Sequence, residues 1–237
     1  MAEKKERSFI KASDQNSTPR TMPTTKTERR EKATGKRIAA VCFWVLGIAC
    51  EVVAILLLNQ TIYPGEGYIM GLSKQLFWML IALIADLIFV IIGSQFWKRA
   101  NDVDPASEQN KVKFWLWNQM GLIVSCIAFF PIIIVLLRNK DLDEKTRKVA
   151  TAVAAVALLI SGLASYDWNP ISAEQRDAME LEYQGTTVYY TTFGKKYHID
   201  QDCPTIINSS NVYYGTIDEA IDAGRTAPCK VCTDKDH

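Results

Sequence analysis

The sequence predicts an all-α membrane domain of four transmembrane helices, followed by a small α+β domain at the C-terminal end. Of the 237 residues, 49% are apolar and 22% are charged, but the apolar residues are concentrated in four runs between positions 38 and 165. Beyond position 185 the pattern changes to short β-branched and aromatic stretches separated by turn signals. This distribution excludes an ordinary soluble globular enzyme and a wholly disordered chain.

Residues 1–37 are expected to form a disordered basic tail, because they offer few large apolar side chains that could bury a core. They carry 11 Lys and Arg against 5 Asp and Glu. The basic stretch at residues 26–37 directly precedes the first apolar run, as expected for a cytoplasmic anchor that faces anionic lipid headgroups. Nucleic-acid binding by this tail is the alternative interpretation.

Each of the four runs approaches or reaches the length that a helix needs to cross a bilayer, at about 1.5 Å of rise per residue. The third run has no charged residue in 24 positions and contains Pro131, which is expected to kink it. The lipid bilayer is therefore the first expected partner of the chain. The predicted spans, within a domain at residues 38–165, are 38–58, 76–93, 114–137 and 149–165.

The distribution of Lys and Arg beside the spans predicts the orientation. With the N-terminus inside, twelve basic residues flank the spans on the cytoplasmic side and six on the opposite side. We therefore expect both termini in the cytoplasm. The alternative is a re-entrant third segment broken at Pro131, which would export the C-terminal domain.

Glu51 and Asp86 are the only Asp, Glu, Lys, Arg or His residues in the four runs. In antiparallel helices their depths would differ by roughly 4 to 5 Å, so the two carboxyl groups could meet. Such a pair would hold a proton or bind a cation, as in a small ion or proton transporter. The favoured interpretation is a protonated, hydrogen-bonded pair that fixes helix packing or homo-oligomerisation.

A helical linker at residues 166–185 is expected to lead into the C-terminal domain at residues 186–237. Ser172 and Gln175 have the spacing of a capping box that opens a short helix. The C-terminal domain is expected to contain a β-hairpin (186–192 and 195–199), a short helix (217–223) opened by a second capping box, and a terminal C-x2-C knuckle.

His198, Cys203, Cys229 and Cys232 combine an H-x4-C spacing with a C-x2-C knuckle. Three soft thiolates and one imidazole suit a closed tetrahedral zinc site. A domain of about 50 residues buries little apolar surface and needs a stabilising cross-link such as a metal ion. The zinc is therefore expected to be structural and to supply much of the folding free energy. A disulfide between Cys203 and one of the last two cysteines is the alternative.

Three further cysteines lie inside the apolar runs, where a thiol is expected to be a small buried hydrophobe. They are Cys42, Cys50 and Cys126.

The segments VYYTTFGKKYHIDQDC and NVYYGTIDEAIDAGRTAPCKVC resemble the Ada-type metal-binding domain. That domain occurs in the bacterial adaptive-response DNA methyltransferase and as a module in other bacterial proteins. The similarity spans about residues 187–232, and its most specific part is the ending helix-Gly-x-x-x-Pro-Cys-x-x-Cys. It implies that Cys203, Cys229 and Cys232 are zinc ligands.

His198 stands where the Ada-type family has its methyl-accepting cysteine, and the first spacing is one residue longer. An imidazole cannot repeat the alkyl transfer of a thiolate, so DNA repair is not expected. Residues 186–237 also carry five Lys and Arg against seven Asp and Glu, which disfavours DNA binding.

No phosphate-binding loop, paired nucleophile and base, or HExxH motif occurs in the sequence, so enzymatic activity is not expected. The leading hypothesis is a non-enzymatic interaction or sensing protein of the bacterial inner membrane that displays a structural zinc module in the cytoplasm. The alternatives are the transporter with a regulatory zinc domain, and a metal or redox sensor that uses the thiolates. The sequence names no protein partner.

Overall fold

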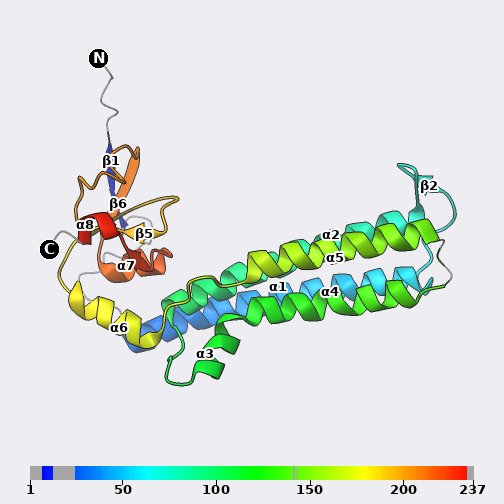
Figure 1. Ribbon diagram of the computed structural model, residues 1–237, viewed down its shortest axis with the longest axis horizontal. Helices are drawn as coiled ribbons and strands as arrows, with labels where there is room; N and C mark the ends of the chain where they lie inside the picture. Colours follow the sequence, from blue (N-terminus) through cyan, green and yellow to red (C-terminus); the bar gives the residue numbers. More distant parts are fainter. Residues whose placement is uncertain (1–6, 13–24, 141, 143, 234–237) are drawn as a thin grey trace, which may run out of the picture. The chain divides into compact units, whose positions relative to one another are not determined.

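The computed structural model describes residues 7–12, 25–140, 142 and 144–233, and the chain divides into two compact units. The first unit combines residues before position 34, residues 99–114 and residues from 170 onward. The second unit comprises residues 34–98 and 115–169 and contains most of the apolar helical length (Figure 1).

Four helices are long and apolar enough to cross a membrane among the residues described. This confirms the prediction of four membrane-length apolar helices. A short hairpin of strands β2 (Tyr68–Ile69) and β3 (Leu72–Ser73) joins the first two. The four helices are α1 (Lys26–Leu58), α2 (Lys74–Val103), α4 (Met120–Arg138) and α5 (Glu144–Ser165).

The third helix is shorter than the predicted span 114–137, because the chain breaks at Gln119. Residues before the break form a separate helix, α3 (Lys111–Asn118). The Gln119 side-chain amide donates to the Asp167 carbonyl at 2.9 Å and accepts from the Asp167 N–H at 3.1 Å. These two bonds tie the break to the segment after α5. Pro131 lies inside a continuous α4, so the re-entrant alternative is wrong.

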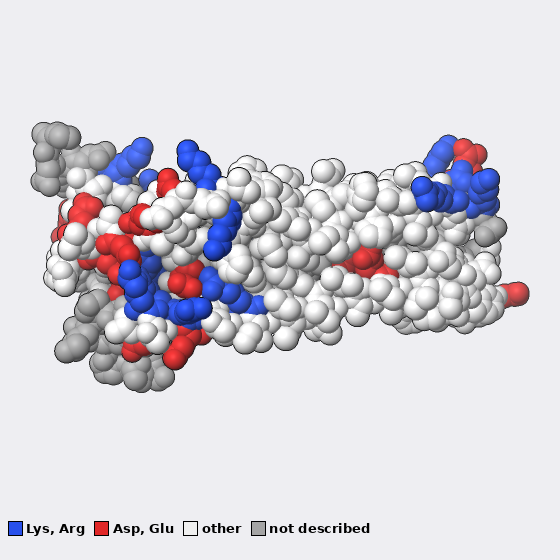
Figure 2. All heavy atoms as spheres, turned by 90° about the horizontal axis from the view of Figure 1, so that it is seen from below, with Lys and Arg blue, Asp and Glu red and all other residues white. Residues whose placement is uncertain are grey.

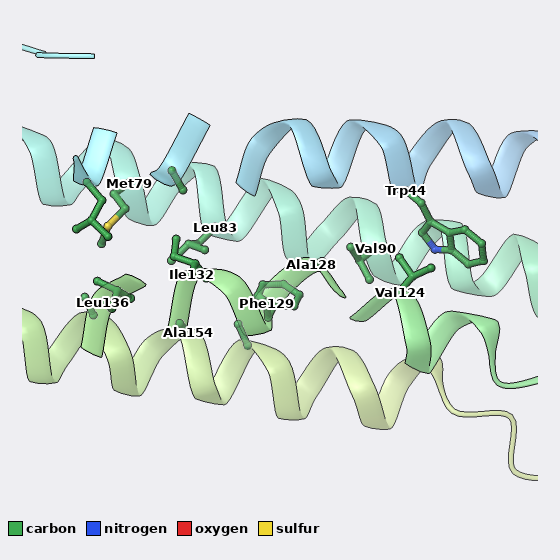
Figure 3. Packing of buried hydrophobic residues seen from close by; sticks show 14 of the residues in the cluster. Trp44, Met79, Leu83, Val90, Val124, Ala128, Phe129, Ile132, Leu136 and Ala154 are labelled. Carbon is green, nitrogen blue, oxygen red and sulfur yellow. The ribbon is translucent and has the colours of Figure 1, made fainter. Parts of the chain in front are cut away.

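The outer surface of the second unit suits lipid, since many large aliphatic side chains on its helices are exposed, among them Val45, Ile84 and Leu159. Figure 2 shows this helical length as mostly free of charged side chains, apart from one isolated group of acidic atoms. Inside, α2, α4 and α5 pack through Met79, Leu83, Phe129, Ile132, Leu136 and Ala154 (Figure 3).

The first unit contains a three-stranded sheet whose order is β1-β6-β4. β4 pairs antiparallel with β6, and β1 pairs parallel with it, from Ser8 opposite Asn211 to Lys11 opposite Tyr214. Figure 1 shows β1 beside β6. The strands are β1 (Ser8–Lys11), β4 (Val188–Thr191) and β6 (Asn211–Gly215).

Two helices in this unit begin with the capping boxes that the sequence predicts. Ser172 and Gln175 cap α6 (Ala173–Glu182), and Thr216 and Glu219 cap α7 (Ile217–Asp222). A second, two-stranded sheet pairs β5 (Lys196–Tyr197) with β7 (Ala227–Pro228), and α8 (Lys230–Thr233) ends the described chain.

The expectation of a disordered tail is wrong for residues 8–11, which form β1, and for residues 26–37, which belong to α1. The rest of that tail lies outside the described residues, apart from single positions beside these elements. The tail cannot bury a core by itself, but it adds a strand to β6, and Ala12 joins a cluster with Val188 and Ile217.

The first two turns of α1 form ion pairs with helices α6 and α7. Arg29 binds Asp177 and Glu180 on α6, and Lys32 binds Asp222 on α7 at 2.8 Å. Because β1 precedes α1 and β6 follows α5, the two ends of the chain lie on the same side of any bilayer that the four helices cross. An even number of crossings follows from this pairing.

Candidate metal centre

His198, Cys203, Cys229 and Cys232 form one cluster, in which the ligand atoms all lie within 4.8 Å of one another. The four residues are between 0% and 5% exposed. Cys203 Sγ is 3.9 Å from Cys229 Sγ, and Cys232 Sγ is 3.8 Å from His198 Nδ1. A tetrahedral zinc ion would separate two sulfurs by about 3.8 Å and a sulfur from the nitrogen by about 3.5 Å. The cluster is compatible with zinc binding.

Parallel pairing of β5 with β7 brings the two halves of this cluster together. Tyr197 lies opposite Pro228, so His198 and Cys229 leave the same end of the two strands. The Cys229 N–H donates to the Tyr197 carbonyl at 2.9 Å, which extends the ladder by one bond. His198 also exchanges two backbone bonds of 2.7 Å with Tyr189 of β4. Backbone hydrogen bonds on both sides therefore hold the histidine.

Tight turns present the other two sulfurs. The Cys203 N–H donates to the Asp200 carbonyl at 3.3 Å, and the Cys232 N–H donates to the Cys229 carbonyl at 3.2 Å at the start of α8. Backbone groups of Val231 and Cys232 also hydrogen-bond to the Cys229 sulfur. Donors of this kind stabilise a thiolate, which is the form that binds metal.

Protonation of the four groups follows their surroundings. Burial lowers the pKa of His198, with Lys196 acting in the same direction, so its imidazole is neutral at neutral pH. Burial opposes ionisation of Cys229, but hydrogen bonds from Thr205 and the backbone outweigh it and lower the pKa of this thiol. Burial raises the pKa of Cys232 to about 11. A metal ion that binds here must displace protons, so affinity is expected to fall in acid.

Thr205 is part of the site, although sequence spacing did not predict it. Its hydroxyl oxygen is 3.2 Å from Cys203 Sγ, 3.6 Å from Cys229 Sγ and 3.4 Å from His198 Nδ1. The only sequence signal was a hydroxyl two residues after a candidate ligand. Its position lets the hydroxyl donate to a thiolate and so orient the ligand sphere.

None of the six cysteines forms a disulfide in the structure. The 3.9 Å between Cys203 Sγ and Cys229 Sγ is far longer than a disulfide bond of about 2.05 Å. The structure therefore disagrees with the disulfide alternative. Cys42 and Cys126 are exposed on their helices rather than buried, because they lie on the outer, apolar face of the second unit.

Arg7, just before β1, contacts the loop between His198 and Cys203. It donates to the Gln201 carbonyl at 3.0 Å and pairs with the Asp202 carboxylate. Its guanidinium also lies 5.3 Å from the centre of the Phe9 ring. The N-terminal segment thus reaches the residue next to a candidate metal ligand, which no pattern in the sequence indicated.

A buried arginine links the other elements of this unit. Arg176 on α6 is 1% exposed, and it donates to Glu180 at 2.8 Å, to Asp218 on α7 at 3.2 Å and to the Asp102 carbonyl at 2.7 Å. One side chain therefore joins α6, α7 and the end of α2.

In the second unit, Glu51 on α1 and Asp86 on α2 lie where these two helices pack together, since Gly47, one turn before Glu51, lies against Asp86. Both are buried, at 4% and 0% exposure. Both carboxyl groups therefore lie inside the packed helices, and their meeting stays a prediction.

Comparison with known proteins gave no match to any family model, to any curated protein or to any solved structure. The Ada-type resemblance therefore stays a prediction.

Proposed function

We propose that this chain is a non-enzymatic membrane protein whose C-terminal module is folded by one structural zinc ion and acts as an interaction or sensing element. The observation that carries the proposal is the buried cluster of His198, Cys203, Cys229 and Cys232, whose ligand atoms lie within 4.8 Å of one another. Three thiolates and an imidazole favour zinc over hard cations such as Mg²⁺. Four protein ligands leave no open position for a reacting water.

Packing around the cluster supports a structural role. The apolar core on this side of the module consists of five buried residues, and three of them are the cysteine ligands, with Ile206 and Val212 beside them. When zinc is bound, it supplies covalent-like links between β5, the loop after it, and α8. Because only Ile206 and Val212 complete this cluster, metal binding is expected to supply much of the free energy that orders this side of the module.

Contacts of the module with the N-terminal segment support a sensing role. Arg7 binds the loop beside Cys203, β1 adds to β6, and Arg29 of α1 binds Glu180. We infer that an ordered metal site keeps β1 in place. We further propose that both termini face the cytoplasm of a bacterial inner membrane, as the Lys and Arg counts predict. The same-side position of the two ends supports this topology.

Redox or metal sensing by the thiolates themselves has less support. The three ligand sulfurs belong to residues that are 0% to 3% exposed, and sensor cysteines are accessible thiolates. DNA binding also has little support, because the module is acidic.

The experiment uses the full chain purified in detergent, with metal content measured by elemental analysis. We expect one equivalent of zinc in the unaltered protein and a loss of at least tenfold in occupancy for Cys229→Ser. Cys42→Ser is the matched control, because Cys42 lies exposed on α1, and it should keep its zinc. A full chain that is free of zinc and keeps the same thermal unfolding with and without chelator would overturn the proposal.

A further inference from the structure

Asp86 and Glu51 are buried, and both have carboxylate oxygens that lack a hydrogen-bond partner. Asp86 is 0% exposed and Glu51 is 4% exposed. Within the described chain, neither carboxylate oxygen of Asp86 has a hydrogen-bond partner, and Glu51 Oε1 has none either. Leaving a charged carboxylate in an apolar interior without a donor costs several kcal/mol or more. The side chains must therefore obtain a donor or lose their charge.

The packing of α1 against α2 places Asp86 in a confined position. A Cβ built on Gly47 would lie 2.8 Å from Asp86 Oδ1 and 3.0 Å from Val90 Cγ2. Only a glycine leaves room for the carboxyl group here. The Asp86 carboxyl group therefore lies directly against the backbone of α1 at Gly47.

Surrounding groups supply no positive charge. Cys50, next to Glu51 on α1, is a further titratable group near Asp86, and the Ile132 backbone on α4 hydrogen-bonds to Glu51. The described lengths of α4 and α5 within the apolar runs contain no Asp, Glu, Lys, Arg or His. An ionised pair would therefore place two negative charges in this apolar interior without a cation beside them.

We propose that Glu51 and Asp86 form an intramembrane proton-binding site, which holds one exchangeable proton between the two carboxyl groups. An ionised carboxylate can only accept hydrogen bonds, whereas a protonated carboxyl also donates one. One proton taken from water forms a single O–H bond, removes one negative charge and supplies the missing donor. The pair then behaves as one titrating unit rather than as two separate acids.

A proton fits this site better than a metal cation. Ca²⁺ takes six to eight oxygen ligands, and Mg²⁺ needs an octahedral shell that usually includes several waters. The two carboxyl groups offer at most four oxygens, and most carbonyls of the surrounding helices are used by helical hydrogen bonds. A proton needs only the two acceptors that the structure provides.

The test uses the full chain in detergent and dicyclohexylcarbodiimide, a hydrophobic reagent that adds to protonated carboxyl groups. The acid O–H adds across one C=N bond of the reagent without a leaving group, and mass spectrometry locates the adduct. We expect one adduct at Glu51 or Asp86 at neutral pH and a decrease of at least tenfold as pH rises. The Glu51→Gln, Asp86→Asn double variant should show none in this segment, whereas Glu66→Gln, in an exposed loop, should label normally.

Infrared pH-difference spectra of the unaltered chain provide a second measurement that needs no variant. A carboxylic acid band should disappear on alkaline titration and should be absent from the double variant. Absence of both the adduct and the band would overturn the proposal, as would protection of the site by Na⁺, K⁺, Mg²⁺ or Ca²⁺ with no effect of pH. The site lies outside the metal cluster, so these results are independent of the zinc measurement.

Discussion

Arg7 donates a hydrogen bond of 3.0 Å to the backbone carbonyl of Gln201, and so ties the segment before the first membrane-length helix to the loop that carries Cys203. The same arginine pairs with Asp202, directly beside the candidate ligand. β1 extends this contact by pairing with β6 from Ser8 to Lys11. The metal site and the N-terminal strand therefore share one loop, and a change in either is expected to reach the other.

Metal removal should release the N-terminal strand. Without metal, the loop at residues 200–203 loses its anchor at Cys203, and β6, whose Val212 packs in the cluster of the three cysteines, loses order with it. Hydrogen exchange measured by mass spectrometry should show that the amides of residues 8–11 are protected in the zinc form and exchange at least tenfold faster in chelator. Peptides from α4 serve as the internal control and should not change. Unaltered protection of β1 in chelator would contradict the link.

Thr205→Val should weaken zinc binding, because the variant lacks the hydroxyl that lies 3.2 Å from Cys203 Sγ. Loss of a group that orients metal ligands typically costs about 10-fold to 100-fold in affinity. Competition with a chromophoric chelator measures this affinity, and Thr205→Ser should restore most of it. Equal affinities for the Val and Ser variants would show that the hydroxyl does not support the ligands.

Arg176→Met should destabilise the first unit strongly, by about 3–5 kcal/mol. The substitution removes the buried guanidinium group that pairs with the carboxylates of Glu180 and Asp218. Lys26→Ala is the matched control. Lys26 pairs with Asp177 at 3.1 Å, but its side chain is 81% exposed, so about 0–1 kcal/mol is expected. Denaturant unfolding followed by far-ultraviolet circular dichroism compares the stabilities of the two variants. A similar effect of both substitutions would contradict a buried role for Arg176.

Gly47→Ala should destabilise the helix packing by about 1–3 kcal/mol, because its Cβ would lie 2.8 Å from Asp86 Oδ1 and 3.0 Å from Val90 Cγ2. Gly35→Ala lies in the same helix, and its Cβ would have no neighbour within 4 Å. That variant should be neutral or more stable, since alanine favours a helix by about 1 kcal/mol. Thermal unfolding in detergent should separate the two, and equal effects would argue against a close contact at Gly47.

Much of the candidate site could be predicted from the sequence because its signals are local. The C-x2-C spacing of Cys229 and Cys232 places two sulfurs on one turn, and the capping boxes at Ser172 and Thr216 define helix starts within four residues. Thr205 could not be predicted in this way. A hydroxyl gains a role in a metal site only when the chain folds back around it, and its neighbours here include a cysteine 24 residues away.

By itself, the sequence determined the four apolar helices, the ligand set and the two carboxyl groups in an apolar setting, because hydropathy, donor chemistry and helical rise are properties of short segments. The tertiary structure alone decided that β1 pairs with β6 and that the third helix begins after Gln119. It also decided that Gly47 gives Asp86 its space. The physical reason is that backbone hydrogen bonds and close packing join residues up to about 200 positions apart. Nearly every strand has the same backbone N–H and C=O groups, and every glycine lacks a side chain, so the local sequence does not identify the partner. Which partners meet depends on the whole fold.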